Sequence, residues 1–112
     1  MAIPSGTGTE VLKRYIKEAQ DDTESTAITG VANHIYTILS IIATNQDSSN
    51  SHIFYIKVNN LFLTRGAPTV GPNETFIWND KFVLSGTDTL KIDGDSSSDF
   101  DVIISYIDQD FS

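Results

Sequence analysis

The residues best suited to metal binding lie in the segment 93–99, Asp-Gly-Asp-Ser-Ser-Ser-Asp. Four side chains that carry oxygen alternate along this segment: Asp93, Asp95, Ser97 and Asp99. Oxygen ligands suit Ca²⁺, but the spacing departs from the helix–loop–helix calcium motif, which has glycine at its sixth position and glutamate at its twelfth. Here glycine is second and Ile104 is twelfth. The pattern is more typical of a polar loop between strands, and we expect no metal and no cofactor.

Two histidines, His34 and His52, are the other candidates for metal or acid–base chemistry. They lie far apart in a chain without cysteine, so the short ligand spacings of a zinc site are missing. The chain also lacks a Gly-x-Ser-x-Gly nucleophile motif. We therefore expect hydrogen bonding at strand edges from both histidines, no catalytic residues, and no enzyme activity.

Aromatic residues suggest one further kind of site. Four rings could form a sugar-stacking platform: Tyr36, Tyr55, Trp78 and Tyr106. Rings on strands more often pack in or beside the core, with the polar atom bonded to a partner. A carbohydrate-binding adsorption module is kept as an alternative function from a second class.

Composition limits the remaining functions. The chain has 112 residues, which suits a single domain, and no cysteine, which excludes disulfides. Its net charge of −8 disfavours nucleic acid as a partner, since phosphate binding depends on Lys and Arg. Its apolar runs are far shorter than the roughly 20 residues that span a bilayer, and the first residues do not resemble a secretory signal peptide.

The charge is unevenly distributed along the chain. Lys13, Arg14 and Lys17 cluster near the start, whereas acidic residues crowd the last quarter. Opposite charges at two ends of a sequence can orient copies of a protein against one another. One interpretation is two unlike patches that meet between neighbouring copies. The other, favoured for most of these residues, is solvated loops and strand faces that keep the protein soluble.

Apolar runs rich in β-branched and aromatic residues predict an all-β chain, most strongly at 34–45 and 101–107. Polar and glycine-containing breaks separate about eight strands at the spacing of a sandwich. We predict an antiparallel β-sandwich, jelly-roll-like, over residues 10–112, preceded by an extended arm over residues 1–9. Both alternating sets of 34–45 are largely apolar, which predicts cover on both faces from the core and from a second layer or partner subunit.

Two segments leave alternatives open. Residues 10–19 fit a helical face almost as well as a strand, and the β context favours a strand. Residues 75–78 and 81–84 flank Asn79 and Asp80, a pair that favours a tight hairpin turn, with a bent continuous strand as the alternative.

Four segments in order along the chain carry a resemblance to known proteins. They are 3–14 (Ile-Pro-Ser-Gly-Thr-Gly-Thr-Glu-Val-Leu-Lys-Arg), 32–41 (Ala-Asn-His-Ile-Tyr-Thr-Ile-Leu-Ser-Ile), 74–81 (Glu-Thr-Phe-Ile-Trp-Asn-Asp-Lys) and 105–110 (Ser-Tyr-Ile-Asp-Gln-Asp). Together they resemble small virion proteins of tailed bacteriophages, especially marine and cyanobacterial phages. The resemblance implies a β-sandwich that acts as a structural or decorating component of the particle, with no active site.

From this resemblance we expect a capsid decoration, or cement, protein that binds the major capsid protein, with a neck or tail component as the alternative. Localisation in the virion and assembly as a trimer are implied by the same family. Main-chain bonding by an extended arm suits attachment to a neighbouring subunit. The candidate partner-binding residues are Ile3, Pro4, Val11, Leu12, Lys13, Arg14 and Lys17.

Overall fold

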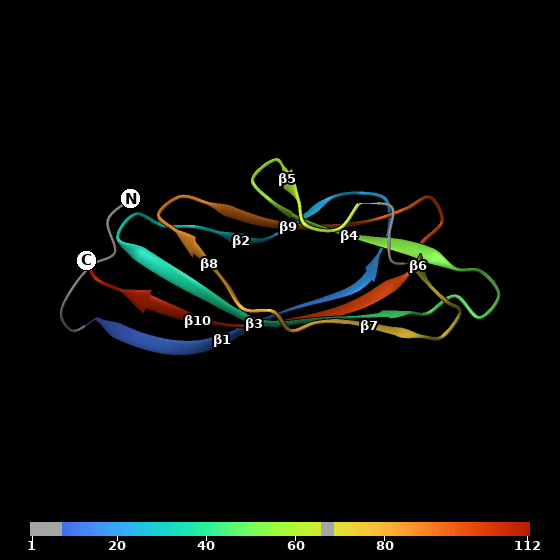
Figure 1. The fold of residues 1–112 in the computed structure, drawn as a ribbon, viewed down its shortest axis with the longest axis horizontal. Coiled ribbons are helices and arrows are strands. Elements are labelled where there is room, and N and C mark those ends of the chain that lie inside the picture. The colour runs from blue at the N-terminus through green and yellow to red at the C-terminus, as the bar shows by residue number, and fades with distance from the viewer. Residues whose placement is uncertain (1–7, 66–68) are drawn as a thin grey trace.

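The computed structural model describes residues 8–65 and 69–112, which form ten strands and no helix. The strands are β1 (Thr9–Gln20), β2 (Ser25–Thr29), β3 (His34–Asn45), β4 (His52–Val58), β5 (Leu61–Phe62), β6 (Thr69–Val70), β7 (Thr75–Trp78), β8 (Phe82–Ser85), β9 (Thr89–Gly94) and β10 (Phe100–Asp110). They make two five-stranded antiparallel sheets that pack face to face (Figure 1). The predicted all-β sandwich is confirmed.

The strand order is that of a jelly roll. Sheet A contains β1, β10, β3 and then β7 with β8, and sheet B contains β2, β9, β4 and then β5 with β6. The pairs β1–β10, β2–β9, β3–β7/β8 and β4–β5/β6 are successive steps of one long antiparallel ribbon that wraps around the core. Because β7/β8 and β5/β6 each occupy one place in a sheet, ten strands fill the roughly eight positions that the sequence predicts.

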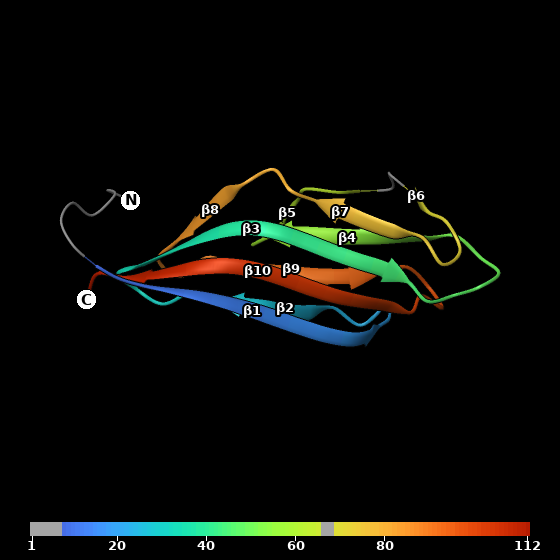
Figure 2. The same ribbon diagram turned by 90° about the horizontal axis from the view of Figure 1, so that it is seen from below.

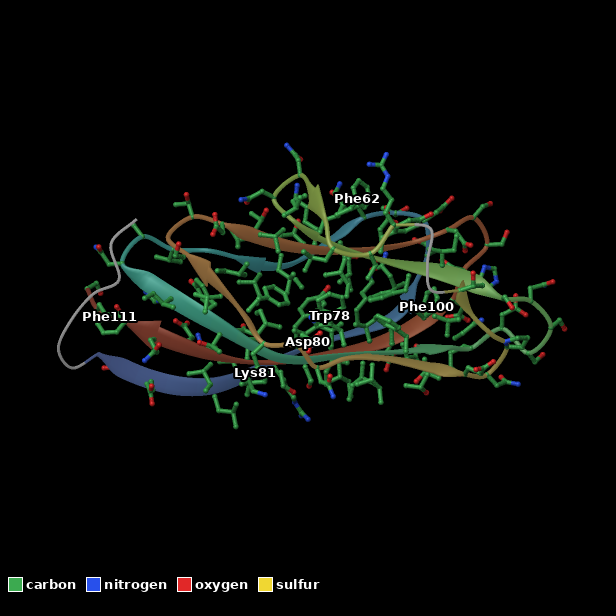
Figure 3. The ribbon with its side chains drawn as sticks, in the orientation of Figure 1. Phe62, Trp78, Asp80, Lys81, Phe100 and Phe111 are labelled. Atoms are coloured by element: carbon green, nitrogen blue, oxygen red, sulfur yellow. The ribbon has the colours of Figure 1, made fainter. Side chains whose placement is uncertain are left out.

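The core lies between the two sheets and is built from β-branched and aromatic side chains. The rings of Phe54 and Phe100 lie 5.2 Å apart, one from each sheet, and close the middle of the sandwich. Figure 3 shows Trp78 and Phe100 in the space between the layers. The fully enclosed side chains come from both sheets: Ile38, Ile41, Leu84, Ile104, Ile56, Leu90 and Ile92.

The strand β3 contains a bulge that changes which residues face the core. It pairs with β10 as Ile38 opposite Tyr106 and Ser40 opposite Ser105, which leaves Leu39 as the extra residue. Because one extra residue shifts the two-residue alternation, the inward set changes from even to odd numbers at this point. Tyr36 and Ile38 are buried before the bulge, and Ile41, Ala43 and Asn45 are buried after it.

Of the two kinds of cover predicted for the outer face of β3, a second layer within the protomer is absent among the described residues, and cover by a partner subunit stays a prediction. Among its outward residues, Thr37 and Ile42 are only half-buried, whereas Ile35, near the start of the strand, is buried. The bulge explains in part why both the even-numbered and the odd-numbered residues of β3 are largely apolar. Even-numbered residues enter the core before Leu39, and odd-numbered residues enter it after Leu39.

The segment at the start of the described chain is a strand. Residues 10–19 are part of the strand β1, as favoured, and β1 begins at Thr9, within the predicted arm. Residues 1–7 of that arm lie outside the described residues.

The predicted hairpin at Asn79 and Asp80 is wrong: β7 and β8 both pair antiparallel with β3, so they form one bent strand, which was the alternative (Figure 2). The bend lies opposite the bulge of β3, where regular pairing is interrupted on both strands.

Candidate interaction face

The outer side of sheet A carries two rows of apolar side chains that cross the strands. Residues directly opposite one another in a sheet share a face. One row contains Ile16, Ile103, Ile42 and Ile77, in the order β1, β10, β3 and β7. The other contains Leu12, Ile107, Thr37 and Val83, in the order β1, β10, β3 and β8. We call these eight residues the apolar face.

Five of the eight members of the apolar face are exposed, and the other three, Thr37, Ile42 and Ile107, are half-buried. Leu12 is 71% exposed, Ile77 58% and Ile103 41%. Four isoleucines aligned across four strands make a contiguous patch, and patches of this kind on soluble proteins mark interaction sites. Ile103 lies between Val102 and Ile104, which are both buried, so the outward position of its side chain follows from the pleat of β10.

Polar contacts border the apolar face at both ends. Beyond Leu12, the side-chain amide of Gln109 donates to the carboxylate of Glu10 across 2.7 Å. Beyond the isoleucine row, the hydroxyls of Thr44 and Thr75 lie 3.0 Å apart. Apolar rows bordered by hydrogen-bonded polar residues are consistent with a protein–protein interface, whose rim is usually polar.

A groove separates the two rows. It has a volume of about 620 Å³ and is lined by Leu12, Lys13, Arg14, Leu39, Ser40, Lys81 and Ser105. The small residues Ser40 and Ser105 face each other where β3 bulges, and the absence of a large side chain at either position opens the groove. Lys81 comes from the bend between β7 and β8, and Figure 3 shows it on the outer side of sheet A.

The basic cluster of β1 does not act as one patch. Leu12 and Arg14 belong to the outer side of the sheet, whereas Val11, Lys13 and Lys17 stand opposite the inward residues of β10. Of the predicted partner-binding residues, Leu12 and Arg14 lie on the outer side of the sheet beside the groove, and Lys13 also lines the groove although its position in β1 belongs to the inward set. Ile3 and Pro4 lie outside the described residues.

Lys13 is bound to the acidic end of its own chain. Its Nζ lies 2.9 Å from Oδ2 of Asp108, and Nδ1 of His34 lies 2.7 Å from Oδ1 of the same carboxylate. Burial alone would raise the pKa of Asp108, but the hydrogen bonds from Lys13 and His34 outweigh this effect and lower it. Since β1 and β10 are neighbours in sheet A, the predicted unlike patches adjoin within one protomer.

The outer side of sheet B is different in character. Lys57 forms an ion pair with Glu24 at 2.7 Å, and Lys57 and Arg65 both lie over the ring of Phe62, at 5.0 and 4.8 Å from its centroid. Tyr55 meets the same ring edge-on. The two sheets thus present unlike surfaces, one apolar and one charged.

The rings proposed as a sugar platform are not brought together. Tyr36 is buried, Tyr106 and Trp78 pack against the core from sheet A, and Tyr55 lies on the outer side of sheet B. Ring positions on opposite layers cannot stack on one sugar. Tyr36 instead accepts a hydrogen bond at its hydroxyl from the backbone N–H of Val31.

Both histidines form the hydrogen bonds expected at strand starts. His52 is held between two carboxylates, with Nδ1 2.7 Å from Asp95 and Nε2 2.8 Å from Asp47. These contacts join the loop after β3 to the loop after β9. Asp95 also accepts from the backbone N–H of Ile53, so the candidate calcium segment is fastened to β4. Across residues 8–65 and 69–112, no three or more His, Cys, Asp or Glu side chains are placed so that they could hold a metal ion together.

Sequence reasoning did not identify the two rows, because they depend on the registers of non-local strand pairs. Ile16, Ile42, Ile77 and Ile103 come from four separate strands, and a shift of one residue in any pairing would bury one of them. A partial signal was present in β10: Ile103 interrupts the inward set of Val102 and Ile104 with a third apolar residue.

No protein-family model matches the chain, and neither does any curated protein sequence. One solved structure that resembles it is described as "Bacillus endospore appendages form a novel family of disulfide-linked pili". The match covers 100% of this chain and 97% of that chain, with a TM-score of 0.54 and 14% sequence identity. At this identity the likeness is evidence of a shared fold. The described part of the chain contains no helix long and apolar enough to cross a membrane.

Proposed function

We propose that this protein is a structural component of a bacteriophage virion, without enzyme activity, that decorates the capsid by binding the major capsid protein. The observation that carries the proposal is the apolar face, whose eight residues lie side by side on one layer of the sandwich. A free subunit that must bury surface on assembly needs such a face. The virion setting is drawn from the resemblance of the four sequence segments.

The arm and the trimer are further parts of this proposal. Residues 1–7 would extend the contact to a neighbouring subunit, with Ile3 as an apolar anchor. A closed three-fold arrangement needs a contact between two different surfaces of successive copies. The trimer, like the virion setting, is drawn from the resemblance of the four sequence segments.

The experiment compares binding to purified particles from which the protein has been stripped. The variant Ile103→Asp places a charge in the middle of the isoleucine row and is expected to lose particle binding. Leu61→Asp is the matched control, because Leu61 is 64% exposed but belongs to sheet B. Equal binding by the wild type and Ile103→Asp would refute the proposed face. Quantitative mass spectrometry then separates roles: hundreds of copies per particle indicate the capsid, and a handful indicate the neck or tail.

A pilus-like polymer is the second candidate, favoured by the full-length structural match to the endospore appendage. The disulfide linkage in that description is not available here, since the chain has no cysteine. Any polymer of this chain would be held by something other than disulfides. Electron microscopy of the concentrated protein tests this directly: regular filaments would favour a pilus-like role, and dispersed particles would count against it.

A further inference from the structure

We infer that the groove in the apolar face binds an extended protein segment that carries two carboxylates on either side of an apolar side chain. This inference rests on the proposed function, because it specifies the chemistry of the partner that contacts the apolar face. Its basis is the combination of cationic walls, a floor of small residues and apolar side chains in one groove.

The groove is lined by the cations Lys13, Arg14 and Lys81, whereas the chain as a whole is acidic, and Lys13 is paired with Asp108. Arg14 on β1 and Lys81 at the bend between β7 and β8 both line it, and they come from opposite edges of sheet A. Neither takes part in an ion pair within residues 8–65 and 69–112. On a protein of net charge −8, two exposed cations beside one groove favour a partner that supplies carboxylates.

The dimensions of the groove fit a short extended segment. It crosses β1, β10 and β3 to reach the bend, which is three strand spacings or about 14 Å. Carboxylates four residues apart on an extended chain are separated by about 13 Å and project from the same side. The residue midway between them points the same way, toward Leu12 and Leu39, while backbone groups can bond to the hydroxyls of Ser40 and Ser105.

The same charges argue against two other occupants. Two copies packed face to face about a two-fold axis through the groove would bring Arg14 and Lys81 of one copy toward those of the other. Like charges directly opposed across an interface are unfavourable. Residues 1–7 of a neighbouring copy, Met-Ala-Ile-Pro-Ser-Gly-Thr, contain no acidic residue to complement the groove.

The test is an NMR titration of the isotope-labelled full chain with two peptides, acetyl-Glu-Ser-Leu-Ser-Glu-amide and its counterpart with Lys in place of both Glu. The acidic peptide is expected to shift the amide signals of Leu39, Ser40 and Ser105. It is expected to bind about tenfold more tightly than the basic peptide, because two exposed ion pairs replace two repulsive contacts. The method detects millimolar binding, so an absence of shifts would overturn the inference.

Charge reversal provides the matched control. The double variant Arg14→Glu, Lys81→Glu is expected to prefer the basic peptide, whereas Arg65→Glu, on the opposite sheet, is expected to keep the preference of the wild type. Equal affinity for both peptides, or shifts confined to other surfaces, would contradict the inference. Such a result, with particle binding that still depends on Ile103, would reject the groove chemistry and leave the proposed function standing.

Discussion

The Nζ atom of Lys13 lies 2.9 Å from Oδ2 of Asp108, and this contact joins the basic segment near the start of the chain to the acidic segment near its end. The sequence predicts that these two regions attract each other between copies. In the fold they are partners on adjacent strands of one sheet. We therefore expect assembly to depend on the charge of Arg14, which faces outward, more than on that of Lys13.

The first prediction concerns the two partners in this contact. Asp108→Asn is expected to lower the free energy of unfolding by about 1–3 kcal/mol, because Asp108 is buried and also binds His34. Lys13→Gln is expected to cost less than about 1 kcal/mol, since the Lys13 side chain is 46% exposed and its ion pair is screened by water. Urea unfolding monitored by Trp78 fluorescence measures both. The reverse order of the two effects would contradict this assignment.

The sequence predicts features that depend on local residue pattern, such as the bounds of a strand, but not features that depend on how two distant strands pair. The bounds of β3, His34–Asn45, coincide with the predicted strand, because its β-branched run and its flanking polar residues are local features. The bulge at Leu39 is not predicted, since it exists only in relation to β10. At Asn79 and Asp80 the turn-forming pair favours a hairpin, and the alternative, a bent continuous strand, is the one that the structure contains, because both halves pair with β3.

The residues of the candidate face also divide into those that local sequence predicts and those that only strand pairing places there. Leu12 and Arg14 are among the partner-binding residues that the sequence predicts, and both lie on the outer side of sheet A. Ile103 and Lys81 are not predicted, because their place beside those residues is set by the order of strands in sheet A. Local composition predicts that β1 contributes to a partner-binding surface. The tertiary fold determines which side chains of β1 lie on the outer side of sheet A.

The second prediction concerns pH and His52. The hydrogen bond to Asp47 raises the pKa of His52 above its usual value near 6.5, and burial opposes the shift only in part. Stability from protonated His52 is therefore fully present below about pH 6.5 and is lost as the pH rises through the folded-state pKa. The bonds from His52, Ser49 and Asn50 lower the pKa of Asp47, so its contribution is present above about pH 4 and declines only at lower pH.

We accordingly expect the free energy of unfolding to fall between about pH 6 and pH 9, and to fall less in His52→Gln than in the wild type. Urea unfolding at the two pH values measures the difference. Gln keeps a polar side chain of similar reach but does not titrate, so it removes the proton linkage. An equal loss in both proteins would show that His52 is not the group responsible.

The third prediction uses two adjacent residues to test the assignment of faces on β10. Ile104→Ala is expected to cost about 2–5 kcal/mol in the free energy of unfolding, because Ile104 is fully buried and the substitution leaves a cavity. Ile103→Ala is expected to cost less than about 1 kcal/mol, since its side chain is 41% exposed. Thermal and urea unfolding of the two variants give the comparison. Similar losses would mean that the apolar face is covered within the protomer.

The last prediction concerns the bulge in β3, where Leu39 has no directly opposite residue in β10. Deleting Leu39 joins Ile38 to Ser40 and leaves a regular alternation, with Ile38 inward, Ser40 outward and Ile41 inward. The bend between β7 and β8 lies opposite and can absorb the shortening. We expect this deletion variant to remain folded and to unfold cooperatively, with an altered groove.

Deleting Ile42 is the matched control within the same strand. It removes a residue that is paired with Ile103 and Ile77, so the following residues change sides. Ala43 and Asn45 would leave the core, and the buried amide of Asn45 would lose its bonds to the carbonyls of Val70 and Gly71. We expect this variant to be unfolded or insoluble by circular dichroism and gel filtration. If both deletions unfold the protein, the Leu39 side chain is itself needed for folding. If both are tolerated, the register of β3 does not determine which of its residues lie in the core.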